Sequence, residues 1–577
     1  MVTPSIETTT VDVLILGAGG AGVLAALHCH DAAPDLSIAI AVKGLLGKCG
    51  CTRMVQGGYN VAVDPADSVE RHFRDTIEGG QWLNDQELAW TLVTGAVERV
   101  MELENRWGCF FDRAADGRVH QKAFAGQSFD RTVHKGSLTG IEIINRLAEQ
   151  VLARSILRLE DHRALDLLPA RDGNGMAGAL LLDIRRGVFR LVRAGAVLLA
   201  TGGGPSMYRY HTPSGDKSTD GLAMALRAGL FLRDMEMVQF HPTGLALGPA
   251  TRATGTIIEE GLRGAGGHLL RADGARFMTD YDPRGERATR DIVSRAMAGE
   301  MRRGNTGPRG GLFLSMAHLD PAMVRRDFRG MVDRCADLGF DLVGGLVEVT
   351  PTAHYLMGGV MFRPDGTTSM PGLYAAGEDT GGVHGANRLG GNGVANSTVF
   401  GGRAGDTIAR HAVAGAAPPE PDPAVVEAAV TAAIRPLSRP AGDLYHHRER
   451  LLDLMWEQVG IIRDGAGLAG ALAELEEIGA GIEATGVAGG PLYNPTWQDR
   501  LNLGNQVLVA RAIATAALAR TDSRGAHYRA DHPAAGPLDE TTHTVVRLEG
   551  DRPVAGLCPV AFPRLRPPPP GCIGGAA

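Results

Sequence analysis

The sequence predicts an α/β protein whose first domain has a Rossmann-like dinucleotide-binding fold. The first observation is residues 11–22, VDVLILGAGGAG, in which a β-branched and aliphatic run leads into closely spaced glycines. Such a run is typical of a strand covered on both faces of a parallel sheet. The second observation is LSIAIAVK at residues 36–43, which predicts the next strand. The third is AVLLATGGG at residues 196–204, another hydrophobic strand that runs into glycines.

Three glycines of the first segment have the spacing of a dinucleotide-binding turn. Gly17 permits the turn, Gly19 lets a pyrophosphate approach the backbone, and Gly22 lets the following helix pack against the strand. The amide groups at the start of that helix favour an anion. Lys43 stands near the end of the second strand, where a standard NAD site has Asp or Glu. We therefore expect this turn to bind a dinucleotide rather than to be a glycine-rich turn without a ligand. Lys43 indicates that the dinucleotide is not NAD bound in the standard way.

Composition limits the class of protein. The 577 residues are enough for three or four domains, and a hydrophobic content of 44% supports large cores. The net charge of −7 gives no sign of nucleic-acid binding. No apolar run is long enough to cross a bilayer, and the N-terminal MVTPSIETTT has no signal-peptide core. With seven scattered cysteines, the chain is expected to be cytoplasmic.

Residues 47–63, GKCGCTRMVQGGYNVAV, predict another tight turn at Gln56, Gly57 and Gly58. Cys49 and Cys51 are expected to be small residues of a packed loop rather than redox or covalent groups. Two cysteines without further ligands nearby predict no metal site.

The other elements follow from periodicity, turn signals and caps. Asp85 is expected to cap a helix, and Asp220 to open one whose N-terminus faces the same ligand as the glycine turn. The predicted elements are two helices within 68–107 separated at Gly79 and Gly80, a strand pair at 110–118, a polar loop at 121–140, a helix at 142–153, a β-meander at 163–204, a Pro/Ala linker from 413, long amphipathic helices from 444, and a Pro-rich tail.

Six polar residues between 241 and 388 lie in Gly- or Pro-rich turns, where rigid backbone presents side chains to a site. Each alone is better explained as a surface ion pair or a satisfied loop histidine. Together they predict a site for a small dianion, because arginine forks pair with carboxylates. These residues are His241, Glu260, Arg263, Arg290, His354 and Arg388.

Motifs along most of the chain resemble those of the flavoprotein subunit of succinate dehydrogenase and fumarate reductase. L-aspartate oxidase and adenylylsulfate reductase belong to the same superfamily. The motifs, in family order, are GAGGAG, QGG, ATGGG, DGLAMALRAG, QFHPTG (239–244), EEGLRGAGG (259–267), TRDIVSRA (289–296), PTAHYLMGGV (351–360), GLYAAGE (372–378), HGANRLGGN (384–392) and SRGAHYRADHP (523–533).

This resemblance implies FAD as the cofactor and an interrupted first domain. The implied domains are an FAD-binding domain at 1–235 and 346–412, an α+β capping domain at 236–345 that includes a helix at 320–339, a helical domain at 413–530 and a C-terminal extension at 531–577. The residues expected to contact FAD are Gly17, Gly19, Gly20, Gly22, Lys43, Cys51, Thr52, Gln56, Gly57, Gly58, Ala200, Thr201, Gly202, Asp220, Glu378 and Asn392.

The resemblance also implies the reaction. Flavin N5 exchanges a hydride with succinate or fumarate, and Arg290 transfers the proton, supplied through Glu260 and Arg263. His241, His354 and Arg388 are expected to bind the carboxylates and to polarise the substrate. A mobile capping domain would exclude water from the flavin.

Two positions depart from the family pattern, and a third distinguishes its succinate and fumarate enzymes from the aspartate oxidases. Cys51 stands where the membrane-bound enzymes attach FAD to a histidine, so non-covalent FAD is expected, with a cysteinyl link as the alternative; this favours fumarate reduction. Glu259 replaces a substrate-binding threonine, and its carboxylate would repel a dianion unless it points away or the substrate differs. Phe124 matches the phenylalanine of the succinate and fumarate enzymes, where aspartate oxidases have a glutamate, and so disfavours a substrate ammonium group.

The leading hypothesis is therefore a succinate dehydrogenase or fumarate reductase. The alternatives are an L-aspartate oxidase-like enzyme and a flavin electron-transfer subunit without dicarboxylate chemistry. No cysteine cluster in the sequence suits an iron–sulfur centre, so a separate iron–sulfur subunit is the expected partner. Such a partner would place the chain peripherally at the inner face of the cytoplasmic membrane.

Overall fold

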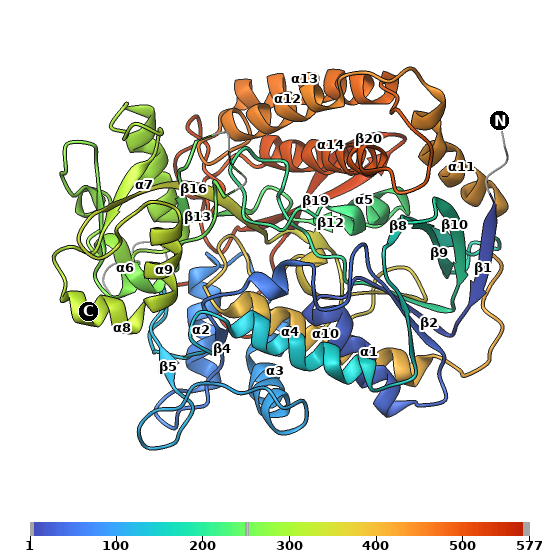
Figure 1. The fold of residues 1–577 in the computed structure, drawn as a ribbon, viewed down its shortest axis with the longest axis horizontal. Helices are drawn as coiled ribbons and strands as arrows, with labels where there is room; N and C mark the ends of the chain where they lie inside the picture. Colours follow the sequence, from blue (N-terminus) through green and yellow to red (C-terminus); the bar gives the residue numbers. More distant parts are fainter. Residues whose placement is uncertain (1–4, 249–250, 252, 569–577) are drawn as a thin grey trace.

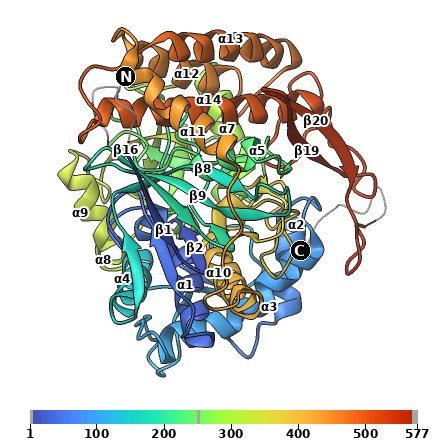
Figure 2. The same cartoon turned by 90° about the vertical axis from the view of Figure 1, so that its right-hand side faces the viewer.

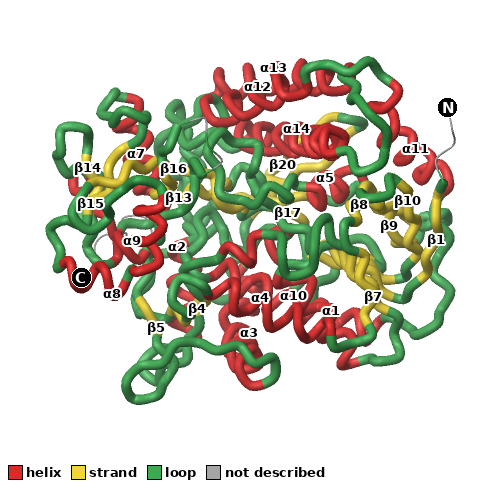
Figure 3. Tube along the Cα trace, in the orientation of Figure 1, coloured by secondary structure: helices red, strands yellow, loops and turns green. Residues whose placement is uncertain are grey.

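The computed structural model describes residues 5–248, 251 and 253–568. Figure 1 shows three groups of elements. The first is a lower α/β layer, to which the beginning and the end of the first 412 residues both contribute. The second is a lobe to the left around α6–α9, and the third is a layer of long helices above. Figure 3 shows that long loops connect these groups where they meet.

A five-stranded parallel sheet forms the centre of the α/β layer, with the first predicted strand in the middle of it. Leu16 pairs with Leu199 on one side and with Ala41 on the other, and all four residues of its strand are buried. The sequence prediction of a parallel, doubly covered strand is confirmed. In spatial order the strands are β18 (Leu373–Ala375), β11 (Ala196–Leu199), β2 (Val13–Leu16), β3 (Ile38–Ala41) and β7 (Ile156–Leu159).

Helices from opposite ends of the domain cover one face of this sheet. The helix after the glycine turn lies side by side with a helix that begins nearly four hundred residues later (Figures 1 and 2). Asp85 caps its helix as predicted, accepting hydrogen bonds from the amides of Glu87 and Leu88. The helices of this domain are α1 (Gly20–Ala32), α2 (Val69–Gly79), α3 (Gln86–Asn105), α4 (Thr139–Leu152), α5 (Asp220–Arg227) and α10 (Asn392–His411).

The predicted β-meander supplies a second sheet. Its first three strands pair antiparallel, its last strand is β11 of the parallel sheet, and the N-terminal strand pairs parallel at its edge. In spatial order this sheet is β1 (Ile6–Thr10), β10 (Val188–Arg193), β9 (Met176–Asp183) and β8 (His162–Pro169). A small sheet near the loops contains β4 (Tyr59–Asn60), β6 (Thr132–Val133) and β5 (Gln121–Lys122). The strand pair predicted at 110–118 is reduced to one bridge between Arg113 and Val119.

The left-hand lobe has its own hydrophobic core, which runs from Leu245 to Val349. Its antiparallel sheet has the order β13 (Val238–Leu245), β16 (Leu346–Leu356), β15 (Leu312–Ser315) and β14 (His268–Leu270). Its helices are α6 (Gly261–Gly264), α7 (Arg290–Arg302), α8 (Pro321–Asp327) and α9 (Arg329–Asp337). The single helix predicted at 320–339 is wrong, because Phe328 leaves the helical region at φ −122° and ψ 29° and separates α8 from α9.

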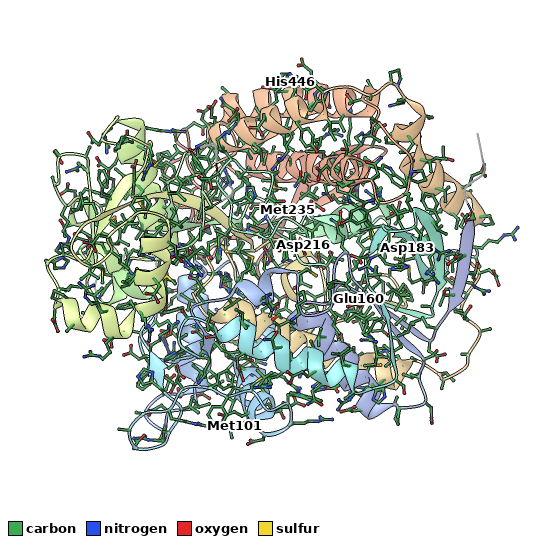
Figure 4. All side chains as sticks on the ribbon, viewed as in Figure 1. Met101, Glu160, Asp183, Asp216, Met235 and His446 are labelled. Atoms are coloured by element: carbon green, nitrogen blue, oxygen red, sulfur yellow. The ribbon has the colours of Figure 1, made fainter. Side chains whose placement is uncertain are left out.

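The upper layer contains α11 (Pro423–Ile434), α12 (Leu444–Glu457), α13 (Gly465–Ala484) and α14 (Pro495–Ala519). His446 lies on its outer face and is exposed, as Figure 4 shows. Beyond it the chain forms a hairpin that enters a sheet with the order β17 (Gly359–Val360), β12 (Leu232–Arg233), β19 (Thr542–Glu549) and β20 (Arg552–Pro559). Much of the predicted C-terminal extension is therefore part of the fold. The domain limits themselves stay predictions.

Within the described residues, no helix combines the length and hydrophobicity that a membrane crossing requires.

Candidate functional site

One cavity of about 1050 Å³ joins the glycine turn of the first strand to the polar residues of the left-hand lobe. Its volume lies at the upper end of the range for small-molecule sites. The wall begins at Gly17 and Gly19, passes Gln56 and Glu378, and reaches His241 at the other end. Asp216, which lies near the middle of the molecule in Figure 4, also lines it. The cavity can therefore hold a long cofactor and a small second ligand in one continuous space.

The glycine turn is built for a close backbone approach. Gly17 has φ +110°, and a Cβ there would lie 2.1 Å from the carbonyl oxygen of Ala200. A Cβ on Gly22 would lie 1.9 Å from the carbonyl oxygen of Gly17, so this glycine lets α1 pack against β2 and does not line the cavity. Gly19 is the N-cap of α1. Thr52 accepts a hydrogen bond from the amide of Gly20 at 2.9 Å.

The predicted QGG turn also requires its glycines. A Cβ on Gly57 would meet the Phe124 ring at 2.4 Å, and one on Gly58, with φ +144°, would meet the carbonyl oxygen of Val133 at 2.4 Å. Gln56 lines the cavity, and its Oε1 atom is buried without a hydrogen-bond partner in the described part of the chain. A buried unpaired acceptor at a cavity wall is typical of a ligand contact.

Two carboxylates at the middle of the cavity are fixed by cations. Asp220, at the start of α5, accepts hydrogen bonds from Lys43 Nζ at 2.8 Å and from Arg163 Nη2 at 2.7 Å. Glu378 accepts one from Lys217 Nζ at 2.9 Å. Burial alone would lower the pKa of Lys217, but nearby Cys51 and Glu378 outweigh it and raise that pKa.

Further predicted cofactor residues surround these carboxylates. Cys51, Ala200, Thr201 and Gly202 line the cavity, and Thr201 donates a hydrogen bond to the buried Asp379 at 3.0 Å. Burial raises the pKa of the Cys51 thiol.

Asn392 is placed differently. Its side chain accepts a hydrogen bond from Asn60 Nδ2 at 2.9 Å and donates one to Thr76 Oγ1 at 3.2 Å, while the neighbouring Gly391 and Gly393 line the cavity.

The far end of the cavity brings together five of the six predicted polar residues at its wall, from separate segments of the chain: Glu260, described below, and four others. His241 lies on β13, His354 on β16, Arg290 at the start of α7 and Arg388 before α10. The two imidazole rings are 5.5 Å apart between centroids. Burial, reinforced by the positive charge of Arg290, holds the pKa of each histidine well below its ordinary value, so both are neutral at physiological pH.

Arg388 is the residue with the most unused hydrogen-bonding capacity at this end. Its buried guanidinium lies over the ring of Tyr355 at 4.4 Å and makes one long hydrogen bond, from Nη1 to the carbonyl oxygen of Leu389 at 3.4 Å. Its Nε has no partner among the described residues. Burial lowers the pKa of Arg388 to about 10, which still leaves it cationic at neutral pH. The arrangement suits a carboxylate ligand, which would take up these donors.

Arg290, Glu260 and Arg263 form a buried chain of charges. Arg290 donates to Glu260 Oε2 from Nε at 3.0 Å, and Arg263 Nη2 donates to Glu260 Oε1 at 3.1 Å. Burial would raise the pKa of Glu260, but the two arginines outweigh it and lower that pKa. Glu260 lines the cavity, whereas Arg263 lies behind it and donates to the carbonyl oxygen of Glu286 at 2.6 Å.

The sequence reasoning missed three residues that complete this end. Gln239 contacts Arg290, Tyr355 supports Arg388, and Thr212 lies 2.8 Å from His354 Nδ1. Gln239 belongs to the same buried strand as His241, two positions away, and that spacing was the signal available for it. The described residues contain no group of three or more side chains that could bind a metal ion.

Comparison with known proteins agrees with this geometry. A family model described as FAD binding domain matches residues 12–394, and one described as fumarate reductase flavoprotein C-term matches residues 448–570. The chain is 38% identical over 540 residues to one of the subunits of fumarate reductase (CoM/CoB) from Methanothermobacter marburgensis, covering 92% of this chain and 96% of that protein. It is 34% identical over 591 residues to the fumarate reductase flavoprotein subunit of Mycobacterium tuberculosis, covering 97% and 99%.

Solved structures give the same result. The FrdA chain of a mutant Escherichia coli quinol fumarate reductase superposes with a TM-score of 0.91 at 32% identity, covering 97% of this chain and 98% of that one. Sdh1 of Mycobacterium smegmatis in complex with UQ1 superposes with a TM-score of 0.86 at 35% identity, covering 97% and 96%. The adenylylsulfate reductase of Archaeoglobus fulgidus, at 18% identity, shares the fold. The chain belongs to the succinate dehydrogenase/fumarate reductase flavoprotein family of FAD-dependent oxidoreductases.

Proposed function

We propose that this protein interconverts succinate and fumarate, or a close C4 dicarboxylate, with non-covalently bound FAD, and that it works mainly as a fumarate reductase. The observation that supports this most is the single cavity in which the glycine turn and the cluster of His241, His354, Arg290 and Arg388 share one wall. The family membership and the names of the relatives support the same reaction.

The residues present fit FAD. Gly17, Gly19 and Gly20 of the first turn line the cavity, the amides of α1 favour a pyrophosphate, and Gln56 offers a buried unpaired acceptor. Bound FAD would supply the hydride transfer that no side chain performs. Non-covalent attachment is supported by the absence of a histidine at position 51 and by the raised pKa of the cysteine there.

The substrate carboxylates would be bound by Arg388 and by the two neutral histidines. Arg388 brings a full positive charge with free donors, and the histidines bring hydrogen bonds without competing for a proton. A dianion held from both ends is oriented and polarised along its double bond. Phe124, buried in the same wall, covers the site with an apolar surface.

Arg290 would exchange the proton with the substrate carbon. Its guanidinium is held by Glu260 and Gln239 at the cavity wall, which fixes its position there. Glu260 would return a proton to Arg290, and Arg263 would supply Glu260 from behind the cavity wall. Closure of the lobe that carries these three residues would exclude water from the reacting atoms.

The relatives named as subunits support a partner protein for electron exchange. We propose that this partner is a separate iron–sulfur protein, which holds the chain peripherally at the inner face of the cytoplasmic membrane.

Turnover with artificial electron carriers tests the proposal without that partner. FAD-loaded protein is expected to oxidise reduced methyl viologen when fumarate is added, and to reduce a dye more slowly with succinate. Peroxide formation from L-aspartate would instead identify an aspartate oxidase. Stoichiometric FAD with no turnover in either direction would contradict the proposal and leave a protein that only transfers electrons.

A further inference from the structure

Glu259 places a second carboxylate, next to that of Glu260, in the wall of the proposed dicarboxylate site. Glu259 is buried at 5% exposure and lines the same cavity as His241 and His354. An uncompensated negative charge in that wall would oppose the binding of a dianion. The charge therefore needs a partner, and the structure provides one from a different part of the chain.

Lys122 is that partner. It lies on β5 of the FAD-binding domain, and its Nζ donates a hydrogen bond to Glu259 Oε1. Its side chain is 21% exposed, against 6% for that of Glu259, so the pair is largely removed from water. The same ammonium group lies 5.7 Å from the centroid of the Phe124 ring. Within the described residues, Lys122 is the single cation within ion-pair distance of Glu259.

We propose that Lys122 is a built-in counter-ion that determines which dicarboxylates the site accepts. With Lys122 present, the Glu259–Lys122 pair carries no net charge, so a dianion meets no repulsion from this wall. The pair also occupies the carboxylate of Glu259, and the neighbouring carboxylate of Glu260 is already bound by two arginines. Neither is free for a substrate ammonium group, and Phe124 offers that group no hydrogen bond. The site therefore selects an unsubstituted C4 dicarboxylate over its amino derivative. This inference rests on the proposed function.

Removal of the Lys122 ammonium group should shift the preference of the site from fumarate towards L-aspartate. In Lys122→Met, Glu259 is left as an unpaired buried carboxylate, so fumarate binding should weaken by about tenfold or more. The freed carboxylate should at the same time improve the binding of L-aspartate relative to fumarate. Lys122→Arg keeps the cation and should keep both affinities close to those of the natural protein.

A double substitution separates the effect of the charge on Glu259 from the effect of losing the ion pair as a structural contact. In Lys122→Met/Glu259→Gln the wall is again uncharged, so fumarate affinity should return to within about threefold of the natural protein, although the ion pair is still absent. A merely structural role of the pair predicts the opposite, namely that the double variant is as impaired as the single one. Lys135→Met is the matched control, because Lys135 belongs to the same polar loop but pairs with Asp112, a carboxylate that does not line the cavity.

Binding to the oxidised, FAD-loaded protein gives a readout that needs no turnover. Fumarate is titrated against the flavin absorption spectrum, and L-aspartate is added as a competitor. Equal fumarate and aspartate affinities in the natural protein and in Lys122→Met, with equal FAD content, would overturn the counter-ion role. The titration of the natural protein comes first and separates the two possible failures. If the natural protein does not bind fumarate, the proposed function is contradicted, and this inference with it.

Discussion

Gln239 connects the arginine proposed to transfer the proton with the arginine proposed to bind the substrate. Its Oε1 accepts a hydrogen bond from Arg290 Nη1 at 3.0 Å, and its Nε2 donates to the backbone carbonyl oxygen of Arg388 at 2.7 Å. Arg290 begins α7 of the left-hand lobe and Arg388 precedes α10 of the α/β layer, so this amide fixes the relative position of two separate parts of the fold.

Substitution of Gln239 by Met should therefore lower kcat more than it weakens substrate binding. Loss of a buried hydrogen bond to a charged group costs about 1.5–3 kcal/mol, which corresponds to roughly a tenfold to hundredfold effect. Steady-state kinetics that separate kcat from KM will check this, with the exposed Gln458→Met as control. An effect confined to KM would show that Gln239 acts on Arg388 alone.

Substitution of Arg290 by Lys should abolish most turnover while leaving the fold and the FAD content intact. Lysine keeps the charge but not the fork that binds Glu260 and Gln239 together. General acid catalysis contributes about 10²–10⁴ in rate, and a loss of that size is expected in fumarate reduction by a reduced dye. Arg295→Lys, on the same helix but against Tyr528, should retain activity. Equal rates for both variants would exclude the proton-transfer role.

Acidification should destabilise the protein below pH about 6.5. Burial lowers the pKa of several histidines and keeps them neutral. The pKa falls to about 4 for His72 and His134, and well below the ordinary value of 6.5 for His241, His354, His384 and His527. The unfolded chain binds protons at these positions and the folded chain does not, so stability rises with pH up to about 6.5 and falls below it. Each contributes up to ~1.4 kcal/mol per pH unit. Burial raises the pKa of Asp379 to about 6, which acts in the opposite sense and offsets one of them.

Urea denaturation between pH 7 and pH 5 will measure this slope. His384→Asn should make it shallower, because His384 is buried beside Tyr355, while the exposed His446→Asn should leave it unchanged. A denaturation midpoint that does not move over this range would contradict the buried neutral state.

Denaturation should release the flavin. Burial raises the pKa of Cys51, and a thiol that remains protonated is a poor nucleophile. Acid precipitation is therefore expected to leave the yellow colour in solution, and Cys51→Ser should bind as much FAD as the natural protein. Flavin that stays with the precipitated natural protein but not with Cys51→Ser would instead establish a cysteinyl link.

Local patterns predicted the parts of the fold that depend on neighbouring residues. The glycine spacing located the turn between β2 and α1, and Asp85 marked the start of α3, because a turn and a cap involve residues a few positions apart. The break at Phe328 was missed, since α8 and α9 continue one helical pattern and tertiary packing decides where it stops. The pairing of β19 with β12 joins segments some three hundred residues apart and leaves no local signal.

The same distinction applies to the site. The family motifs named the charged and histidine residues of the cavity, because each motif is a short contiguous stretch of sequence. The turns expected around these residues were wrong for His241 and His354, which lie on β13 and β16, and for Arg290, which begins α7. The pair of Lys122 and Glu259 was not predicted, although Glu259 was noticed as unusual, because its partner is 137 positions away. Asn392 was expected at the cofactor, yet its side chain bonds to Asn60 and Thr76, which only the fold brings next to it.

The packing of α1 against α10 has a consequence for how the protein folds during its synthesis. When the first 345 residues have left the ribosome, the glycine turn, Gln56 and Arg290 exist, but β18, Glu378, Arg388 and α10 have not yet been made. N-terminal domains commonly fold first during translation, but here the first domain lacks an edge strand and a covering helix until residue 411 emerges. We therefore expect cofactor loading to be a late event in biosynthesis, because Glu378 and Arg388 of the cavity wall are made only after residue 345.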